Sequence, residues 1–387
     1  MRVLHLPSWY IPEGGMFCTE QSIALKQAGV EVHILANVAL PWRKYKSRIY
    51  SFPRKPFFTE ENGITLLRYY AKRIPFADMW NMKLWVRNTL RLYDMYFEKF
   101  GHPDIIHTHS SMWAGYAAAL IKQRYGVPYV ITEHRGRFSE NSIESDELFP
   151  LSYHPFLYQA FENAHSIIIV SEQLRKKVAL YAGENVPIYT ISNVVNTDFY
   201  TEKKEQNPIR PFTFINANSY HFAKAYDVLL DAFEKVYAQY PETTLLLLGN
   251  GFDDAQFVVQ LNKLRSKNKI EFKGYQPPEG VLHYLHKSDS FVLSSRIESQ
   301  SVAILEAMSC GLPIVCTEVV PSEIVIPTIG VRCKTDNADA LAEAMIYMIE
   351  HHASFSSTDI RQFAVSVCSQ KAVASQILAV YKQIIHG

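Results

Sequence analysis

The stretch SFVLSSRIESQSVAILEAMSCGLPIV, residues 290–315, contains the pattern that decides the fold. A short apolar strand leads into a polar loop, a helix begins after Ser301 and ends before Gly311, and a second apolar strand follows. The helix is apolar on nearly every face, so we expect it to be buried. Its only charge is Glu306, and Glu298 stands in the preceding loop with seven residues between the two. The strand–helix–strand order is typical of an α/β sheet.

The two glutamates are candidate binding residues for a ligand. A carboxylate in a buried helix costs several kcal/mol, roughly, unless it is paired, so Glu306 needs a partner outside its own helix. Glu298 lies where an α/β sheet presents its ligand crevice, and the N–H groups of Ser301 and Val302 at the positive helix end form an anion pocket beside it. On spacing alone a second interpretation stays open. In it Glu298 is a solvated loop acid and Glu306 is a core residue satisfied by Arg296.

Length and composition indicate a protein of two domains. A chain of 387 residues exceeds the size at which one core keeps growing. Its five cysteines show no CxxC or Cys/His spacing, so the sequence indicates neither a disulfide framework nor a zinc site, and a reducing compartment is expected. The opening MRVLHLPSWYIP is too short and polar for a signal peptide, and no apolar run approaches about 18 residues. We therefore expect a cytoplasmic protein.

The net charge of +1 hides an uneven distribution. Residues 1–200 carry 22 Lys and Arg against 18 Asp and Glu, and much of the excess lies in residues 42–58, where basic and aromatic side chains alternate. One interpretation is a surface patch that contacts an anionic lipid headgroup at the inner membrane face, a pyrophosphate-linked acceptor or a polysaccharide. The other is a loop whose aromatic side chains pack into the core. The charge excess is too small to favour a nucleic-acid partner.

Short apolar runs separated by helical patterns recur in both halves of the chain and predict parallel, doubly wound sheets. The first half contains seven: RVLHL, VEVHIL, ITLLRYY, DIIHTH, PYVIT, SIIIV and PIYTI. The second contains five: FTFINANS, TTLLLLG, KIEFKG, DSFVLSS and LPIVCT. The polar segment 196–211 between the halves is the predicted linker. We expect two Rossmann-like domains, and a last helix near residues 371–385 that crosses back to the first.

Further segments resemble, in their order, the family four retaining glycosyltransferases of the GT-B fold. They are SWYIPEGGMFCTEQSIALKQAGVEVHIL, PDIIHTH, VSEQLRKKV, TISNVVNTDFY, FAKAYDVLLDAF, LLLLGNGFDDAQ and KIEFKGYQPPEGVLHYLHKSDSFVL. The resemblance covers the whole chain. It implies an acceptor-binding domain over residues 1–200, a nucleotide-sugar-binding domain over residues 201–370 and a returning C-terminal helix over residues 371–387.

The resemblance also implies roles for individual residues. Glu306 matches the acid that holds the ribose hydroxyls of the donor, and Glu298 matches the acid at the transferred sugar. Lys224 matches the lysine that neutralises the leaving diphosphate, a task that a metal performs elsewhere, so no metal and no cofactor are expected. His109 matches the active-site histidine, with a contact to the donor sugar or phosphate.

The glycine loops and one tyrosine are further matches on the donor side. Gly14 and Gly15 match the N-terminal glycine loop, where a side chain would block the approach of a phosphate or sugar. Gly249 and Gly251 match a loop that approaches the nucleotide base, and Tyr275 falls where that base is stacked or paired. A plain turn is the alternative for each glycine pair.

On the acceptor side, Glu133 and His134 are candidates that would bind a hydroxyl or take its proton. A structural role is the alternative, as it is for Asn193, which we expect to fix the interdomain turn. The sequence departs from the family at Ser219, which replaces an arginine that contacts the diphosphate. Either Arg296 compensates for it, or the helix dipole takes a larger part in holding the donor.

A second departure lies between the two glutamates. Ser299, Gln300 and Ser301 replace the common glycine and phenylalanine, and we expect them to influence the choice of donor sugar. The resemblance implies retaining transfer of a hexose or N-acetylhexosamine from a UDP-sugar to a glycan or lipid-linked acceptor. Two alternatives stay open: a sugar-nucleotide 2-epimerase or phosphorylase, and a non-catalytic binding protein. A dinucleotide oxidoreductase is disfavoured because no GxGxxG follows either first strand.

Overall fold

The apolar runs form two separate sheets in the computed structural model, which describes residues 1–45, 51–140, 150–202 and 210–386. The first sheet has the order β3-β4-β2-β1-β5-β6-β7-β8. Its strands are β1 (Arg2–Pro7), β2 (Glu31–Pro41), β3 (Phe57–Glu61), β4 (Ile64–Arg73), β5 (Ile105–His109), β6 (Tyr129–Glu133), β7 (Ser166–Ile169) and β8 (Ile188–Thr190). The second has the order β11-β10-β9-β12-β13-β14. Its strands are β9 (Thr213–Ala217), β10 (Thr244–Leu248), β11 (Ile270–Gly274), β12 (Ser290–Leu293), β13 (Ile314–Thr317) and β14 (Gly330–Cys333).

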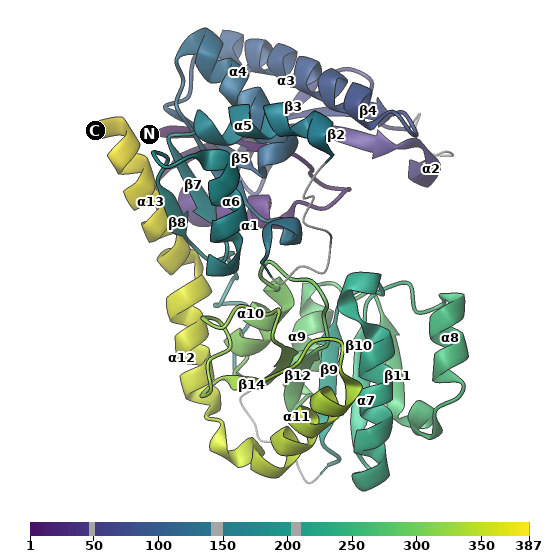
Figure 1. The fold of residues 1–387 in the computed structure, drawn as a ribbon. Helices are drawn as coiled ribbons and strands as arrows, with labels where there is room; N and C mark the ends of the chain where they lie inside the picture. Colours follow the sequence, from purple (N-terminus) through teal and green to yellow (C-terminus); the bar gives the residue numbers. More distant parts are fainter. Residues whose placement is uncertain (46–50, 141–149, 203–209, 387) are drawn as a thin grey trace.

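Helices cover both faces of each sheet, which forms the core of one lobe (Figure 1). The N-terminal lobe contains α1 (Met16–Gln27), α2 (Trp42–Tyr45), α3 (Asp78–Phe100), α4 (Tyr116–Tyr125), α5 (His154–Glu162) and α6 (Arg175–Ala182). The C-terminal lobe contains α7 (Tyr226–Gln239), α8 (Ala255–Leu261), α9 (Pro278–His286), α10 (Val302–Ser309) and α11 (Ala338–His351), and α12 (Ser357–Cys368) and α13 (Gln370–His386) follow. The prediction of two Rossmann-like domains with parallel sheets is confirmed, with the exception of β3, which is antiparallel to β4.

The chain passes between the lobes twice, at neighbouring points. Val195 and Ser369 form a parallel bridge, and the Val195 N–H donates to the Cys368 carbonyl at 2.8 Å. Beyond this point α13 crosses to the N-terminal lobe, where it packs along α1 (Figure 1). The returning C-terminal helix is therefore confirmed, and its apolar face completes the core beneath β1 and β2.

Residues 42–58 belong only partly to the surface. Phe52 packs against Tyr70 with 4.8 Å between ring centroids, and Phe58 packs against Phe100 at 5.7 Å. The basic side chains of residues 54 and 55 are exposed, whereas residues 46–50, with part of the predicted basic patch, lie outside the described residues. Across the described part of the chain, helices long and apolar enough to cross a bilayer are absent.

Candidate active site at the lobe interface

Lys224 and Glu298 form an ion pair, although 73 residues separate them in the sequence. Lys224 ends a 3₁₀ turn after β9, and Glu298 follows β12, the neighbouring strand, so both lie at the carboxyl edge of the second sheet. The Lys224 ammonium donates to Glu298 Oε1 at 2.6 Å, and the Ser295 hydroxyl donates to the same oxygen at 2.7 Å. A cation and a carboxylate are thus held together at the sheet edge where α/β proteins bind ligands.

The amino end of α10 lies directly beyond this pair. Ser301 occupies the N-cap position, but its side chain makes no capping hydrogen bond. The first-turn N–H groups of a helix have no partner within the helix, and the positive end of the helix dipole adds to their effect. Val302, the first helical residue, is 36% exposed. The geometry suits an oxyanion beside Glu298.

Glu306 lies half-buried on the same helix and has no cationic partner in the described site. Burial raises the pKa of its carboxyl to about 7, while a hydrogen bond with Tyr200 lowers the pKa and the charge of Glu20 raises it. Tyr200 follows the first crossing between the lobes, and Glu20 belongs to α1. The carboxyl therefore stands between the two lobes.

Arg296 is not the partner of Glu306, and it is not directed toward the Lys224–Glu298 pair. Its guanidinium forms ion pairs with Asp227 at 2.6 Å and Asp336 at 2.7 Å. The predicted role of Arg296 as the partner of Glu306 is therefore corrected, whereas its role in place of the arginine missing at position 219 stays a prediction. The attraction of the guanidinium to the two adjacent carboxylates, Asp227 and Asp336, is stronger than its attraction to the more distant Glu306 carboxyl.

The predicted glycine loops have backbone conformations that require glycine. Gly15 has φ +86°, and a Cβ there would lie 2.5 Å from the Trp9 carbonyl oxygen. Gly249 has φ +134°, and a Cβ there would lie 2.4 Å from the Asn218 carbonyl oxygen. The adjacent Gly14 and Gly251 also have positive φ, and Tyr275 is 71% exposed after β11. Gly15 and Gly249 are therefore required by close backbone packing within their own loops, because a side chain at either position would clash with a carbonyl oxygen.

A row of hydrogen-bonded imidazoles crosses the first sheet. His109 Nε2 lies 2.9 Å from His5 Nδ1, and His109 Nδ1 lies 3.2 Å from His134 Nε2. His134 Nδ1 in turn lies 3.0 Å from Asn193 Oδ1. Burial holds the pKa of His109 well below its usual range and lowers the pKa of His134 to about 3. The predicted contact of His109 with the donor is corrected, because this ring is fully buried and both of its nitrogens are engaged.

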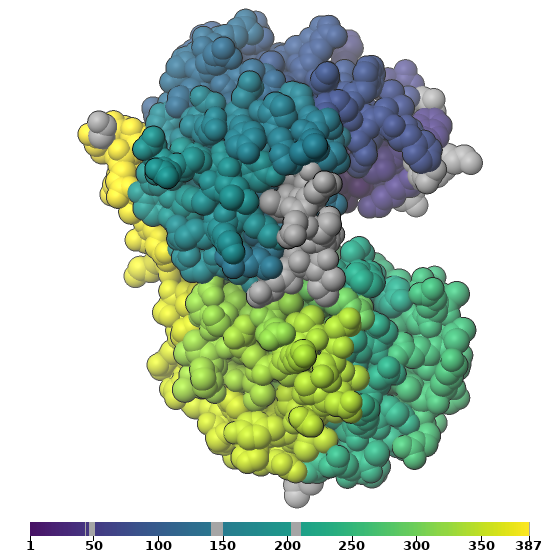
Figure 2. All heavy atoms as spheres, viewed as in Figure 1, coloured from purple at the N-terminus to yellow at the C-terminus, as the bar shows by residue number. Residues whose placement is uncertain are grey.

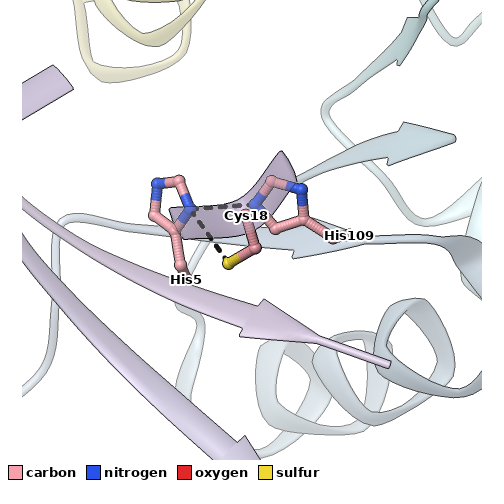
Figure 3. A group of neighbouring side chains, drawn as sticks. All are labelled: His5, Cys18 and His109. Carbon is pink, nitrogen blue, oxygen red and sulfur yellow. Dashed lines mark hydrogen bonds between the residues drawn. The ribbon is translucent and has the colours of Figure 1, made fainter. Parts of the chain in front are cut away.

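Figure 3 shows Cys18 beside His5 and His109, three potential metal ligands. Tetrahedral zinc with bonds of about 2.0 to 2.1 Å separates two nitrogen ligands by about 3.3 Å. The 2.9 Å separation between the two imidazoles is instead that of a hydrogen bond. Burial also raises the pKa of the Cys18 thiol well above its usual range, which opposes the thiolate that a metal needs. The cluster is best described as part of the imidazole row.

Glu133 supports a turn and does not face an acceptor. Its carboxylate is fully buried and accepts hydrogen bonds from the Ser110 hydroxyl, from the Ser111 N–H and hydroxyl, and from the N–H groups of His134 and Arg135. Ser110 has φ +75°, a conformation that costs energy for a residue other than glycine. The predicted acceptor-side role of Glu133 is therefore corrected: the carboxylate stabilises the strained turn after β5.

The residues between the two glutamates contact the N-terminal lobe. Gln300 Oε1 accepts from the Asn193 N–H at 2.7 Å and from the Ser192 hydroxyl at 3.2 Å. The Ser299 hydroxyl donates to the His134 carbonyl at 2.7 Å. Gln173 donates to the carbonyl of Ser299 at 3.0 Å. Ser299 and Gln300 therefore join the lobes, their influence on donor choice stays a prediction, and Asn193 lies at the contact between the lobes.

A cavity of about 530 Å³ opens at the carboxyl edge of the first sheet. Its walls come from the carboxyl ends of β2 and β4 and from the segments that follow β1, β4, β5 and β6, and they include two tryptophans and three arginines. Figure 2 shows that the surface is hollowed between the two lobes. Sequence reasoning did not find this cavity, because its side chains come from five separate strand ends.

Two sequence families match the chain from residue 14 to residue 360. The family described as Glycosyltransferase Family 4 matches residues 14–199, and the family described as Glycosyl transferases group 1 matches residues 199–360. The two matches meet inside the predicted linker, between the two sheets.

Individual relatives are distant. The chain is 23% identical to the glycogen synthase of Mycobacterium tuberculosis over 272 aligned residues. The alignment covers 70% of this chain and 66% of the synthase, slightly less than two thirds of the length of that protein. It is 24% identical over 362 residues to the putative teichuronic acid biosynthesis glycosyltransferase TuaC of Bacillus subtilis, 88% of this chain and 86% of that one.

Solved structures show the same fold. The sucrose-phosphate synthase of Thermosynechococcus elongatus has a TM-score of 0.79 at 17% identity and covers 100% of both chains. Anabaena HepE in complex with UDP and glucose has a TM-score of 0.73 at 17% identity, with 99% of this chain and 100% of that one covered.

Proposed function

Because this chain belongs to the group 1 glycosyltransferases of the GT-B fold, we propose that it transfers a hexose or N-acetylhexosamine from a nucleotide-sugar to a glycan or lipid-linked acceptor in the synthesis of cell-surface polysaccharide or glycoconjugates. The donor is a UDP-sugar, the configuration of the sugar is retained, and no metal takes part. The UDP complex of the structural neighbour HepE supports the choice of nucleotide.

The observation that carries this proposal is the pairing of Lys224 with Glu298 at 2.6 Å, next to the amino end of α10. In the reaction the bond between the sugar carbon and the diphosphate oxygen breaks, and its electron pair leaves with the diphosphate. The Lys224 ammonium and the N–H groups of Ser301 and Val302 stabilise that charge. Glu298 holds the transferred sugar, and Glu306 accepts hydrogen bonds from the ribose hydroxyls.

The acceptor hydroxyl enters on the face that the diphosphate leaves, so the new bond retains the configuration. The neighbouring candidates for a general base are engaged: Glu133 accepts hydrogen bonds from the turn after β5, and His134 is bonded at both ring nitrogens. The proton of the acceptor hydroxyl therefore passes to the departing phosphate oxygen. Closing of the lobes excludes water from this step.

The acceptor approaches from the N-terminal lobe, and residues 42–58 contribute a peripheral contact with the inner face of the membrane. The exposed basic side chains at positions 54 and 55 support this assignment. Exposed apolar side chains nearby add to it: Ile74 at 44% and Phe76 at 90% exposure lie between β4 and α3, and Trp80 at 53% lies in the first turn of α3. A basic rim around apolar anchors is the pattern of an interfacial surface.

Thermal-shift measurements with UDP, GDP, ADP and their sugars test the donor site. We expect UDP and a UDP-sugar to raise the melting temperature, and a shift with none of the nucleotides would overturn the proposal. Turnover of the sugar nucleotide without any acceptor would favour the epimerase alternative. Binding without turnover in the presence of a broad acceptor set would favour the binding protein.

Substitution of the lysine tests the chemistry. We expect Lys224→Met to lower the transfer rate by about 10²–10³-fold, because one preorganised donor to the developing charge is lost. Lys235→Met is the matched control, since Lys235 lies exposed on α7 in an ion pair with Asp339. Initial rates with a UDP-sugar measure both variants. Equal rates for the two variants would remove Lys224 from the mechanism.

A further inference from the structure

The outer face of α3 carries three cations in a row, here called the basic stripe: Lys83, Arg87 and Arg91. All three are exposed and follow one another at the spacing of helix turns, with the exposed Trp80 one turn before them. At about 100° per residue, the four side chains lie within an arc of roughly 80° and extend along about 17 Å of the helix. The opposite face of α3 packs into the core of the N-terminal lobe, so the stripe is fixed toward solvent (Figure 1).

The basic stripe has no anionic partner among the residues that the structure describes. The acids of α3 on either side of it are engaged elsewhere: Asp78 pairs with Arg73 at 2.7 Å, and Asp94 pairs with Arg124 at 3.6 Å. Glu98, the next acid on the same arc, lies about 10 Å beyond the last cation of the stripe. Three positive charges therefore face solvent without compensation and attract an anionic surface.

Exposed apolar side chains continue the stripe at its amino end. Ile74 and Phe76 lie in the segment before α3, and Trp80 lies in its first turn. Phe76 has φ +61°, a conformation that costs energy for a residue other than glycine, and its side chain is 90% exposed. A strained backbone that presents an aromatic ring to solvent is a sign of function, and grouped exposed apolar side chains indicate a surface that meets a partner or a membrane.

The apolar end of the stripe adjoins the larger cavity of the lobe. A smaller cavity of about 240 Å³ lies between Trp42 and Phe76. It shares Pro41, Arg73 and Asp78 with the cavity of about 530 Å³. A bilayer at this end is therefore next to the larger cavity, which suits a lipid-linked acceptor, one of the two acceptor classes in the proposed function.

The order of the side chains favours a bilayer over a nucleic acid. A protein that binds a single strand interleaves aromatic rings with cations, so that bases stack while phosphates pair. Here the apolar side chains gather at one end, and the cations follow along the helix. Tryptophan and other apolar residues at the lipid interface, beside lysines and arginines that contact anionic headgroups, form the pattern of a helix that lies on a membrane.

We propose that the basic stripe, together with Ile74, Phe76 and Trp80, docks the protein on a bilayer that contains anionic lipid. The three cations contact lipid phosphates, and the apolar side chains insert at the level of the headgroups and upper acyl chains. The assignment rests on the proposed peripheral membrane contact and names α3 as its main part, ahead of residues 42–58.

Co-sedimentation of the full chain with vesicles tests the assignment. One set of vesicles contains phosphatidylcholine alone, and the other an equimolar mixture of phosphatidylcholine and phosphatidylglycerol. We expect the wild type to bind the mixed vesicles at least tenfold more tightly than the neutral ones, and added salt to weaken the binding. The combined substitution Lys83→Gln, Arg87→Gln and Arg91→Gln should weaken binding to the mixed vesicles by about 100-fold, because each cation contributes about fivefold.

Matched variants separate the stripe from overall charge and overall hydrophobicity. The combined substitution Lys263→Gln, Lys267→Gln and Lys287→Gln removes three exposed cations from the C-terminal lobe and should bind the vesicles as the wild type does. Phe76→Ser should weaken binding by about tenfold, because an inserted aromatic side chain is lost. Leu180→Ser, at an exposed position on α6, is its control and should leave the binding unchanged.

Four outcomes would overturn the assignment. They are no binding of the wild type to the mixed vesicles, an equal loss in the stripe variant and its charge control, a loss that follows Arg54→Gln with Lys55→Gln instead, and binding of heparin through the stripe without binding of vesicles. The thermal shift with UDP is measured on every variant and shows that each is folded. Absence of that shift in the wild type counts against the donor site and not against the docking surface.

Discussion

Glu306 links the protonation of one carboxyl to the stability of the molecule. Its pKa is raised to about 7, so between pH 4.5 and 7 the folded state keeps a proton that the unfolded state has lost. The folded state then binds more protons, and the free energy of unfolding falls as the pH rises through this window, by roughly 3 kcal/mol. Without ligand, we expect Glu306→Gln to be more stable than the wild type at pH 8 by about this amount.

Urea unfolding at pH 4.5 and pH 8 measures the effect. The difference between wild type and variant should shrink toward pH 4.5, where the carboxyl is protonated in the folded state and half protonated in the unfolded state. Glu343→Gln, at an exposed position on α11, is the control and should follow the wild type at both pH values. An identical pH dependence for Glu306→Gln and the wild type would contradict the raised pKa. Binding of UDP to the wild type should strengthen above pH 7, because the ionised carboxylate accepts the ribose hydroxyls.

Glu133 provides the second prediction at the scale of one residue. Its buried carboxylate accepts hydrogen bonds from Ser110, Ser111, His134 and Arg135. An amide in its place directs two N–H groups at other donors, so Glu133→Gln should destabilise the N-terminal lobe by about 2 to 4 kcal/mol. Urea unfolding checks this, with Glu162→Gln at an exposed position of α5 as control. If Glu133→Gln keeps the stability of the wild type but loses transfer activity, Glu133 would have the acceptor-side role that the sequence predicted.

At the scale of the element, the local sequence pattern was sufficient to predict the strands that carry a regular apolar run and the buried helix α10. The twelve apolar runs all became strands, and α10 begins directly after Ser301 as predicted. Two strands were missed: the antiparallel β3, because the basic residues around it suggested a loop, and the short β14 at the edge of the second sheet.

The site was predictable only where its members share one element or one family motif. Glu298, Glu306 and Lys224 were identified from the sequence, and their proximity follows from neighbouring strands. Pairings between distant segments leave no local pattern: the sequence could not indicate that Arg296 is held by Asp227 and Asp336. The same reason hid the imidazole row and the cavity.

The loop between β12 and α10 carries the prediction that belongs to this scale. Gln300 contributes two hydrogen bonds across the lobe interface, each worth about 1 kcal/mol. Gln300→Ala should therefore favour open over closed lobes by roughly tenfold or more and lower kcat/KM to a similar extent. Small-angle scattering should give a larger radius of gyration for the variant without ligand.

A matched glutamine makes that experiment specific. Gln256 lies exposed on α8 and has no part in the lobe interface, so Gln256→Ala should match the wild type in both scattering and rate. If Gln300→Ala keeps the wild-type radius and loses activity, the side chain acts on the donor and not on the closure of the lobes.

At the scale of the whole molecule, α13 determines how the two lobes share stability. Tyr381 on this helix is fully buried in the N-terminal lobe, and its hydroxyl is hydrogen-bonded to His107. Tyr381→Ala should destabilise that lobe by about 3 to 5 kcal/mol and leave the other lobe nearly unchanged. All five tryptophans of the chain precede residue 114, so tryptophan fluorescence during urea unfolding follows the N-terminal lobe alone.

Tyr347 supplies the control, because it is 46% exposed on α11. Tyr347→Ala should leave the fluorescence transition in place. Hydrogen exchange at β9 and β10 should be the same in both variants and in the wild type. A parallel loss of protection in both lobes of Tyr381→Ala would show that the molecule unfolds as one unit.

The return of α13 to the first lobe also has a consequence for synthesis on the ribosome. The surface of α1 that Ile377 and Tyr381 cover is made early, whereas the helix that covers it emerges only after the entire C-terminal lobe has been translated. At about 5 to 20 residues per second, that surface waits for roughly 20 to 70 seconds. During this interval the nascent N-terminal lobe exposes an apolar groove, which makes it a natural client for ribosome-associated chaperones.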